Sequence, residues 1–234
     1  MTVNRAFILF EQSGTFRDAF RSLGIDAECY DIADEFGKTD HRVDLFAEID
    51  RAFDGRPSVF DAISSDDLVM AFFPCTYFET RQMVYFNITS INLARRPDDK
   101  YSVILTRLRQ REHHMALLYK LLAIAEKRGL KMIIENPAQK PHFLLFETNF
   151  IKPTYIDTDR RRRGDYFKKP TAFWFVGCEP TEGMTRQTAN CRKTVDRERE
   201  GISRSLMSPD YARNFICDKI LGRKETRQQL KLNI

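Results

Sequence analysis

Short apolar runs alternate along the chain with segments whose apolar residues recur every three or four positions. The short runs predict β-strands at residues 5–10, 26–32, 67–73, 131–137 and 171–176. The periodic segments predict helices at residues 16–23, 45–53, 101–128 and 209–221. Strands that alternate with helices favour an α/β fold, so we expect a Rossmann-like, mostly parallel sheet with helices on both faces.

Local signals set several boundaries of these elements. Gly24 and Gly129 follow the first and the longest helix, as helix-ending glycines do. Ser208 and Pro209 suit the start of the last helix, because serine can cap the helix and proline fits its first turn. Residues 79–101 show no clear period, and we expect a long loop or irregular helices there.

The composition is that of an ordinary globular protein. The chain has 234 residues, 42% hydrophobic and 30% charged, so we expect one substantial core and a single domain over residues 1–234. It contains no run of eighteen apolar residues and no signal segment, which predicts a cytoplasmic protein without a membrane partner, in the host cytoplasm if the chain is viral. Five cysteines without CxxC spacing favour reduced thiols.

Basic residues gather in the second half of the chain. The formal net charge is +5, and the acids are concentrated in residues 26–67. Residues 151–231 carry most of the excess base, including the four arginines 160–163 and the pair Arg192-Lys193. This asymmetry fits a surface that faces phosphates, and it fits a solvated run of charge equally well.

A cysteine follows one predicted strand directly after a proline. Ligands of parallel α/β sheets bind beyond the carboxyl ends of the strands, and Cys75 lies at such an end, which makes it a candidate nucleophile. Glu135 ends another apolar strand at the same edge, where partial burial would raise its pKa and suit it to protonate a ring nitrogen. The simpler alternatives are a small buried thiol and a surface carboxylate.

The loop after the first strand has features of a cofactor site. Residues 10–17 place small residues, with Gly14 among them, between a strand and a helix, where the backbone can approach a ligand. Asp31 ends the next strand and can bind a pair of ribose hydroxyls. A plain tight turn is the alternative.

Taken in order, these segments resemble the DNA cytosine-5 methyltransferases, whose motifs read approximately FxGxGGF, acid, PCQ and ENV. The matching segments are Phe10 to Arg17, Asp31, Pro74-Cys75-Thr76 and Glu135-Asn136-Pro137. Gln12 and Thr15 stand where the family has loop glycines.

The chain is more similar to small methyltransferase-like proteins that are common in phages. The similarity lies in residues 74–78, 135–137, 162–174 and 204–212, and the resemblance covers most of residues 5–221. Only about 26 residues separate Cys178 from Arg204, where the larger enzymes insert a target recognition domain. We therefore expect a reduced insertion at residues 178–204 and no separate target recognition domain.

The resemblance implies a class I methyltransferase fold that uses S-adenosylmethionine to methylate carbon 5 of cytosine. It assigns the cofactor to Phe10, Gly14, Thr15, Phe16, Asp31, Ile32, Asp44 and Leu45. A Cys75 thiolate with a lowered pKa would add to carbon 6 of the base, Glu135 would hold the ring, and Arg162 or Arg163 would stabilise developing charge. The acceptor would be DNA, as a single strand or a flipped cytosine, or a cytosine nucleotide.

Other functions compete with this one. The main alternative is a catalytically inactive methyltransferase-like module that binds nucleic acid, a nucleotide or a partner protein, for example in phage–host conflict. A zinc-dependent deaminase is disfavoured because Phe78 stands where its second cysteine would be. Cys178 and Cys191 would supply only two zinc ligands, so we expect no metal site.

Overall fold

A seven-stranded sheet forms the centre of the molecule. The computed structural model describes residues 1–94, 99–146, 149–183 and 206–223, and the strands within them lie in the order β3-β2-β1-β4-β5-β7-β6. Their bounds are β1 Arg5–Leu9, β2 Asp26–Asp31, β3 His41–Arg42, β4 Leu68–Ala71, β5 Lys131–Pro137, β6 Tyr155–Asp157 and β7 Thr171–Val176. The first five strands are parallel, and β7 runs antiparallel to both of its neighbours. The expected α/β fold with a mostly parallel sheet is confirmed.

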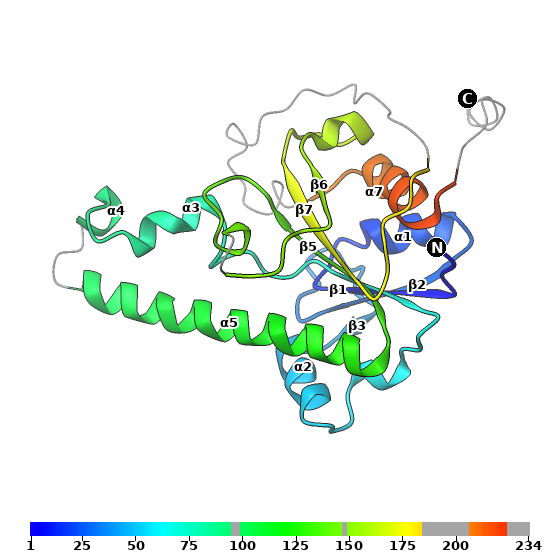
Figure 1. The fold of residues 1–234 in the computed structure, drawn as a ribbon, viewed down its shortest axis with the longest axis horizontal. Helices are drawn as coiled ribbons and strands as arrows, with labels where there is room; N and C mark the ends of the chain where they lie inside the picture. Colours follow the sequence, from blue (N-terminus) through cyan, green and yellow to red (C-terminus); the bar gives the residue numbers. More distant parts are fainter. Residues whose placement is uncertain (95–98, 147–148, 184–205, 224–234) are drawn as a thin grey trace.

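Helices cover both faces of this sheet (Figure 1). α1 (Thr15–Ser22) and α7 (Pro209–Phe215) pack together on one face, and α2 (Leu45–Phe53) and α5 (Lys100–Arg128) pack together on the other. The remaining short helices are η1 Val59–Ala62, α3 Thr80–Met83, η2 Val84–Phe86, α4 Ile91–Ala94, η3 Phe143–Leu145, η4 Arg160–Arg163 and the π-helix η6 Ile216–Leu221.

The central strands β1 and β4 are apolar along most of their length because both of their faces are buried. In β1, Phe7 and Leu9 join the core under α2 and α5, whereas Ala6 and Ile8 join the core under α1 and α7. Side chains of a strand point alternately to its two faces, and covered parallel sheets therefore read as continuous apolar runs. This explains why these strands could be found in the sequence.

The predicted boundaries agree with the structure at several points. The long helix extends from Lys100 to Arg128, and Gly129 follows it in the left-handed conformation. The Ser208 hydroxyl accepts a hydrogen bond of 3.0 Å from the backbone N–H of Tyr211 and so caps α7. The sequence pattern missed β3 and β6, which have only two and three residues.

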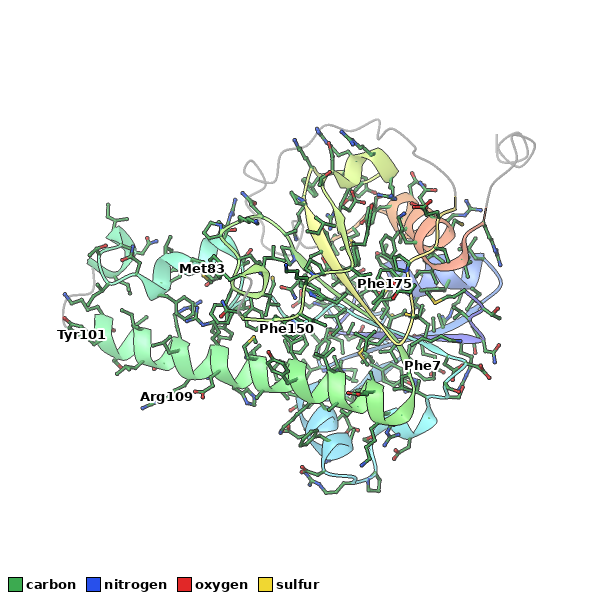
Figure 2. The ribbon with its side chains drawn as sticks, in the orientation of Figure 1. Phe7, Met83, Tyr101, Arg109, Phe150 and Phe175 are labelled. Atoms are coloured by element: carbon green, nitrogen blue, oxygen red, sulfur yellow. The ribbon has the colours of Figure 1, made fainter. Side chains whose placement is uncertain are left out.

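The amino-terminal end of α5 extends beyond the sheet. Leu118 and Ala125 are buried as their spacing predicted, but Leu105 is 54% exposed although it belongs to the same apolar stripe. Figures 1 and 2 show that this end of the helix, which carries Tyr101 and Arg109, lies past the edge of the sheet. The apolar stripe is therefore longer than the core that it covers.

Some expectations concern segments outside the described residues. Residues 184–205 include most of the reduced insertion, Cys191, the Arg192-Lys193 pair and Arg204, and they lie outside the described part of the chain. Within the described part, no helix has both the length and the apolar character needed to cross a membrane.

Candidate functional site

A cavity of about 780 Å³ opens at the carboxyl ends of the parallel strands. Phe10 follows β1, Asp31 ends β2, Phe72 follows β4, and Glu135 comes from β5; all four line the cavity. β1 and β4 are neighbours in the sheet, and the chain leaves them toward opposite edges. Open α/β sheets bind ligands at such a switch point. The cavity is therefore the candidate functional site.

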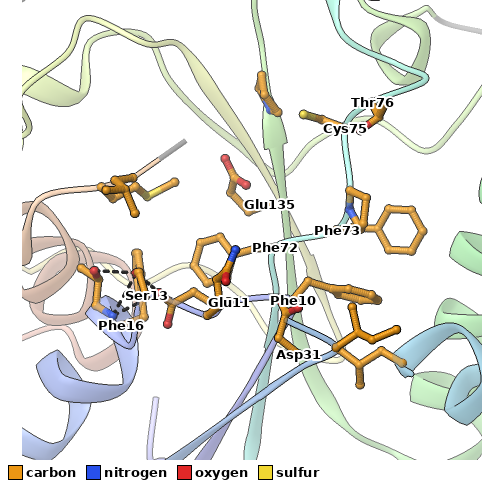
Figure 3. Close-up of a pocket in the computed structure, with 18 of the residues that line it drawn as sticks. Phe10, Glu11, Ser13, Phe16, Asp31, Phe72, Phe73, Cys75, Thr76 and Glu135 are labelled. Carbon is orange, nitrogen blue, oxygen red and sulfur yellow. Dashed lines mark hydrogen bonds between the residues drawn. The ribbon is translucent and has the colours of Figure 1, made fainter. Parts of the chain in front are cut away.

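Most residues that the sequence assigned to a site line this one cavity. They are Phe10, Thr15, Phe16, Asp31, Ile32, Asp44, Leu45, Cys75 and Glu135. Figure 3 shows Cys75 and Glu135 on one side of the cavity and Glu11, Ser13 and Asp31 on the other. Gly14, Arg162 and its alternative Arg163 are the assigned residues that do not line it.

Gly14 contributes to the loop through its backbone conformation. Its φ of 68° lies in the left-handed region, and it occupies the cap position at the start of α1. A Cβ at this position would lie 2.8 Å from Nη2 of Arg17. The backbone conformation favours glycine, and any side chain here would displace the Arg17 guanidinium group. The cavity itself is lined by its neighbours Ser13 and Thr15.

Phe10 also has a left-handed backbone, with φ of 61°, which is unusual for a residue with a large side chain. Its ring centroid lies 5.4 Å from that of Phe73 and 5.7 Å from that of Phe46. The conformation costs about 1–2 kcal/mol, and this packing compensates for it. The turn forms an apolar wall where the first strand meets the cavity.

Glu11 is a cavity residue that the sequence analysis missed. It is only 8% exposed, and it accepts hydrogen bonds from the Ser13 hydroxyl, from the Thr15 N–H at 3.1 Å and from the Cys29 thiol at 3.4 Å. Burial raises the pKa of Glu11, and these hydrogen bonds oppose the rise. A buried acid in the loop after β1 places negative charge, or a proton donor, at this end of the cavity.

Two further carboxylates face the same end. Asp31 accepts a hydrogen bond of 2.8 Å from the Ala33 N–H, and burial raises the pKa of Asp31. Asp44 is exposed, and its Oδ1 caps α2 by accepting from the N–H groups of Phe46 at 3.0 Å and Ala47 at 3.3 Å. Asp44 therefore caps α2 and also lines the cavity.

Cys75 stands at the other side of the cavity, directly after Pro74. Its carbonyl accepts hydrogen bonds from the N–H groups of Phe78 at 2.9 Å and Glu79 at 3.0 Å, which form the turn that leads away from β4. Burial raises the pKa of the Cys75 thiol to about 11; the charge of Lys169 opposes this shift, whereas Glu79 and Glu135 add to it. The sequence-based expectation of a lowered pKa is therefore wrong for this state of the protein.

Glu135 is held inside the sheet, opposite Phe173 in the neighbouring strand β7. Its side chain is 7% exposed, and burial raises its pKa, opposed by the charges of Lys169 and Arg160. A raised pKa favours the protonated carboxyl, which can donate a hydrogen bond to a ligand. The sequence predicted both this placement and the direction of the shift.

Lys169 places a cation in the wall of the cavity, and the sequence analysis did not single it out. β7 runs antiparallel to β5 with Thr171 opposite Pro137, so the residues before Thr171 lie at the carboxyl end of β5. This pairing brings Lys169 to the edge that carries Glu135 and Cys75. Burial lowers the pKa of Lys169, as does the charge of Arg160, and the charge of Glu135 opposes this.

Three of the four arginines 160–163 form ion pairs with carboxylates of the protein. Arg160 is fully buried with its Nε 2.5 Å from Oδ2 of Asp165, which is fully buried too. Arg163 pairs with Asp157 at 2.5 Å and Asp218 at 2.8 Å, and Arg161 pairs with Asp159 at 2.8 Å. Arg162 is exposed and outside the cavity, so the structure does not bring this predicted site residue to Cys75. The run of arginines is therefore not fully solvated.

His114 closes the cavity from α5. It is 6% exposed, its ring lies 4.7 Å from that of Tyr77 and 5.1 Å from that of Phe46, and burial lowers its pKa. Its Nδ1 lies 2.8 Å from the Gln110 carbonyl, which can only accept, so Nδ1 carries the proton and the neutral ring keeps an acceptor at Nε2. The pattern of α5 alone did not distinguish His114 from a core residue.

The described residues contain no group of three or more His, Cys, Asp or Glu side chains placed to hold a metal ion. Comparisons with protein-family models and with curated proteins found no match for the chain. Functional inference therefore depends on the geometry of the cavity.

Proposed function

We propose that this protein transfers a methyl group from S-adenosylmethionine to carbon 5 of cytosine in DNA through a covalent adduct with Cys75. The observation that carries the proposal is the convergence of Cys75, Glu135 and Asp31 on one cavity at the switch point of the sheet. These residues lie far apart in the sequence, and they supply a nucleophile, an acid and a ribose ligand.

The end of the cavity near β1 and β2 suits the methyl donor. Asp31 can accept hydrogen bonds from ribose hydroxyls, and Ile32 and Leu45 offer apolar surface to an adenine ring. Glu11 adds a carboxyl group, which complements the positive sulfonium and ammonium groups of the donor. When bound, S-adenosylmethionine supplies an electrophilic methyl group at this end.

The opposite end suits a pyrimidine. Cys75 can add to carbon 6 of cytosine, which makes carbon 5 nucleophilic, and the protonated carboxyl of Glu135 can hydrogen-bond the ring nitrogen whose electron density rises in this step. A base inside duplex DNA cannot reach such a cavity. The acceptor is therefore an unpaired cytosine, in a single strand or flipped from a duplex, with a cytosine nucleotide as the smaller alternative.

The proposal is tested by transfer of labelled methyl from S-adenosylmethionine to single-stranded DNA, duplex DNA and deoxycytidine triphosphate. We expect label in cytosine with the wild-type protein and none with Cys75→Ser. Cys178→Ser is the matched control, because this thiol does not line the cavity, and it should keep full transfer.

A calorimetric titration separates the proposal from its main alternative. Binding of S-adenosylmethionine without transfer to any acceptor would identify a catalytically inactive module. Absence of binding at millimolar donor would reject the methyltransferase proposal altogether.

A further inference from the structure

The proposed reaction needs a thiolate, and the cavity holds Cys75 as a thiol. Burial raises the pKa of Cys75 to about 11, so the thiol form predominates at pH 7. A buried thiol of this kind becomes an effective nucleophile when a neighbouring base takes its proton. The structure must therefore provide a proton acceptor next to Cys75.

Among the titratable side chains that line the cavity, Glu135, His114 and Lys169 are the candidates. Glu135 is unsuitable because burial favours its protonated form, which is also the form that the pyrimidine ring requires. His114 has an acceptor nitrogen, but its ring packs against the aromatic side chains of Tyr77 and Phe46, and it is not among the groups whose charge acts on the Cys75 thiol. Lys169 is the remaining candidate, and it is the cation whose charge acts most strongly on the Cys75 thiol.

The position of Lys169 follows from the antiparallel insertion of β7. Thr171 pairs with Pro137 at the end of β5, and the Ala138 N–H donates a hydrogen bond of 2.8 Å to the Pro170 carbonyl. These contacts fix the backbone on both sides of the segment that precedes β7. Lys169 is thereby anchored at the edge of the sheet to which Pro74 brings Cys75.

Burial favours the neutral amine of Lys169. Burial and the nearby Arg160 guanidinium lower the pKa of Lys169, and the charges of Glu135, Cys75 and Glu79 oppose this shift. Arg160 itself is compensated by Asp165 at 2.5 Å. A neutral amine has a lone pair and can accept a proton, which a permanently charged lysine could not do.

The geometry points to Lys169 as the base that takes the proton of Cys75. This inference rests on the proposed function. The S–H bond of Cys75 breaks, its proton moves to the lone pair of Lys169 Nζ, and the sulfur electron pair forms the bond to carbon 6 of the base. The electron pair of the C5–C6 double bond moves to carbon 5. At the end of the cycle the C5–H bond breaks and its proton passes to water, its electron pair re-forms the C5–C6 double bond, and the sulfur–carbon bond breaks. The sulfur then recovers its proton from the Lys169 ammonium group.

Alkylation of Cys75 by iodoacetamide tests the inference without donor or DNA. The rate at Cys75 is measured by peptide mass spectrometry between pH 6 and 10. If Lys169 accepts the proton, the ion pair forms with no net proton uptake or release, and the wild-type rate should show a pH-independent plateau near neutrality. If the alkylation rate of the wild-type protein rises tenfold per pH unit over the whole range, without a plateau, this result by itself would overturn the inference.

Variants at two adjacent lysines sharpen the test. Lys169→Met should abolish the plateau and lower the rate at pH 7.5 roughly a hundredfold. Lys168→Met is the matched control, since Lys168 is exposed and does not line the cavity, and it should behave as wild type. Equal rates in Lys169→Met and wild type would also overturn the inference.

Chemical rescue distinguishes a base from a fixed positive charge. In Lys169→Ala, added methylamine should restore the plateau, whereas methylguanidinium, which carries charge but accepts no proton, should not. Equal rescue by both would reduce Lys169 to an electrostatic role and reject the base. Failure of methyl transfer with a normal alkylation plateau would reject the proposed function and leave the role of Lys169 intact.

Discussion

The side-chain amide of Asn136 donates a buried hydrogen bond of 2.8 Å to the backbone carbonyl of Phe73. Asn136 follows Glu135 in β5, and Phe73 precedes the Pro74-Cys75 turn after β4. One hydrogen bond thus joins the two segments that carry the candidate acid and the candidate nucleophile. In the Glu135-Asn136 pair, Glu135 is the candidate acid, and Asn136 holds β5 to the segment that leads to Cys75.

Asn136→Ala should loosen this connection. Leaving a buried carbonyl unpaired costs about 1–3 kcal/mol, which urea unfolding would measure. Asn149→Ala is the matched control, because Asn149 Nδ2 donates a similar hydrogen bond of 3.2 Å to the Phe143 carbonyl and neither residue lines the cavity. Both variants should lose stability, but only Asn136→Ala should change the alkylation rate of Cys75. An unchanged rate would show that Asn136 serves the fold alone.

Asp31→Asn should weaken donor binding. A hydrogen bond to a charged group contributes about 1.5–3 kcal/mol, so we expect the dissociation constant of S-adenosylmethionine to rise roughly ten- to hundredfold in a calorimetric titration. Glu35→Gln removes a nearby exposed carboxylate that does not line the cavity, and it should leave the affinity unchanged. Similar effects of both substitutions would point to general charge attraction instead of a ribose contact.

Gly14→Ala should damage the loop after β1. Gly14 and Gly24 both have positive φ, 68° and 80°, so alanine costs about 1–2 kcal/mol at either position. Only at position 14 does the new Cβ collide, at 2.8 Å from Nη2 of Arg17, which pairs with Asp40. Thermal unfolding should therefore show a larger loss for Gly14→Ala than for Gly24→Ala, and donor affinity should fall only in the former.

His142 should make the protein sensitive to acid. Burial lowers the pKa of His142 to about 4, below the value near 6.5 of an unfolded chain. Above pH 6.5 His142 is neutral in both the folded and the unfolded protein, so its protonation does not reduce the free energy of unfolding. As the pH falls from about 6.5 to about 4, His142 gains a proton only in the unfolded protein. The free energy of unfolding should then drop by up to about 1.4 kcal/mol per pH unit.

The variant His142→Phe should remove this component of the pH dependence. His113→Gln, at an exposed position, should retain it. The measurement is urea unfolding at several pH values between 4 and 7. If the free energy of unfolding changed with pH in the same way in wild type and His142→Phe, His142 would not be the source of the acid sensitivity.

The sequence by itself determined the alternating elements and the edge of the sheet where the site lies. Strands buried on both faces read as apolar runs, and Asp31, Cys75 and Glu135 stand where such runs end. The α5 pattern predicted the helix but not its exposed end, because the length of an apolar stripe does not show how much core it covers.

Tertiary structure decided which charges reach the cavity. Lys169 arrives there through the antiparallel pairing of β7 with β5, a long-range contact that no local pattern specifies. Arg160 looks like its three arginine neighbours in the sequence, yet it alone among them is fully buried beside Asp165. The acidity of Cys75 likewise depends on burial and on neighbours brought from other strands, so the sequence located the thiol while only the fold set its pKa.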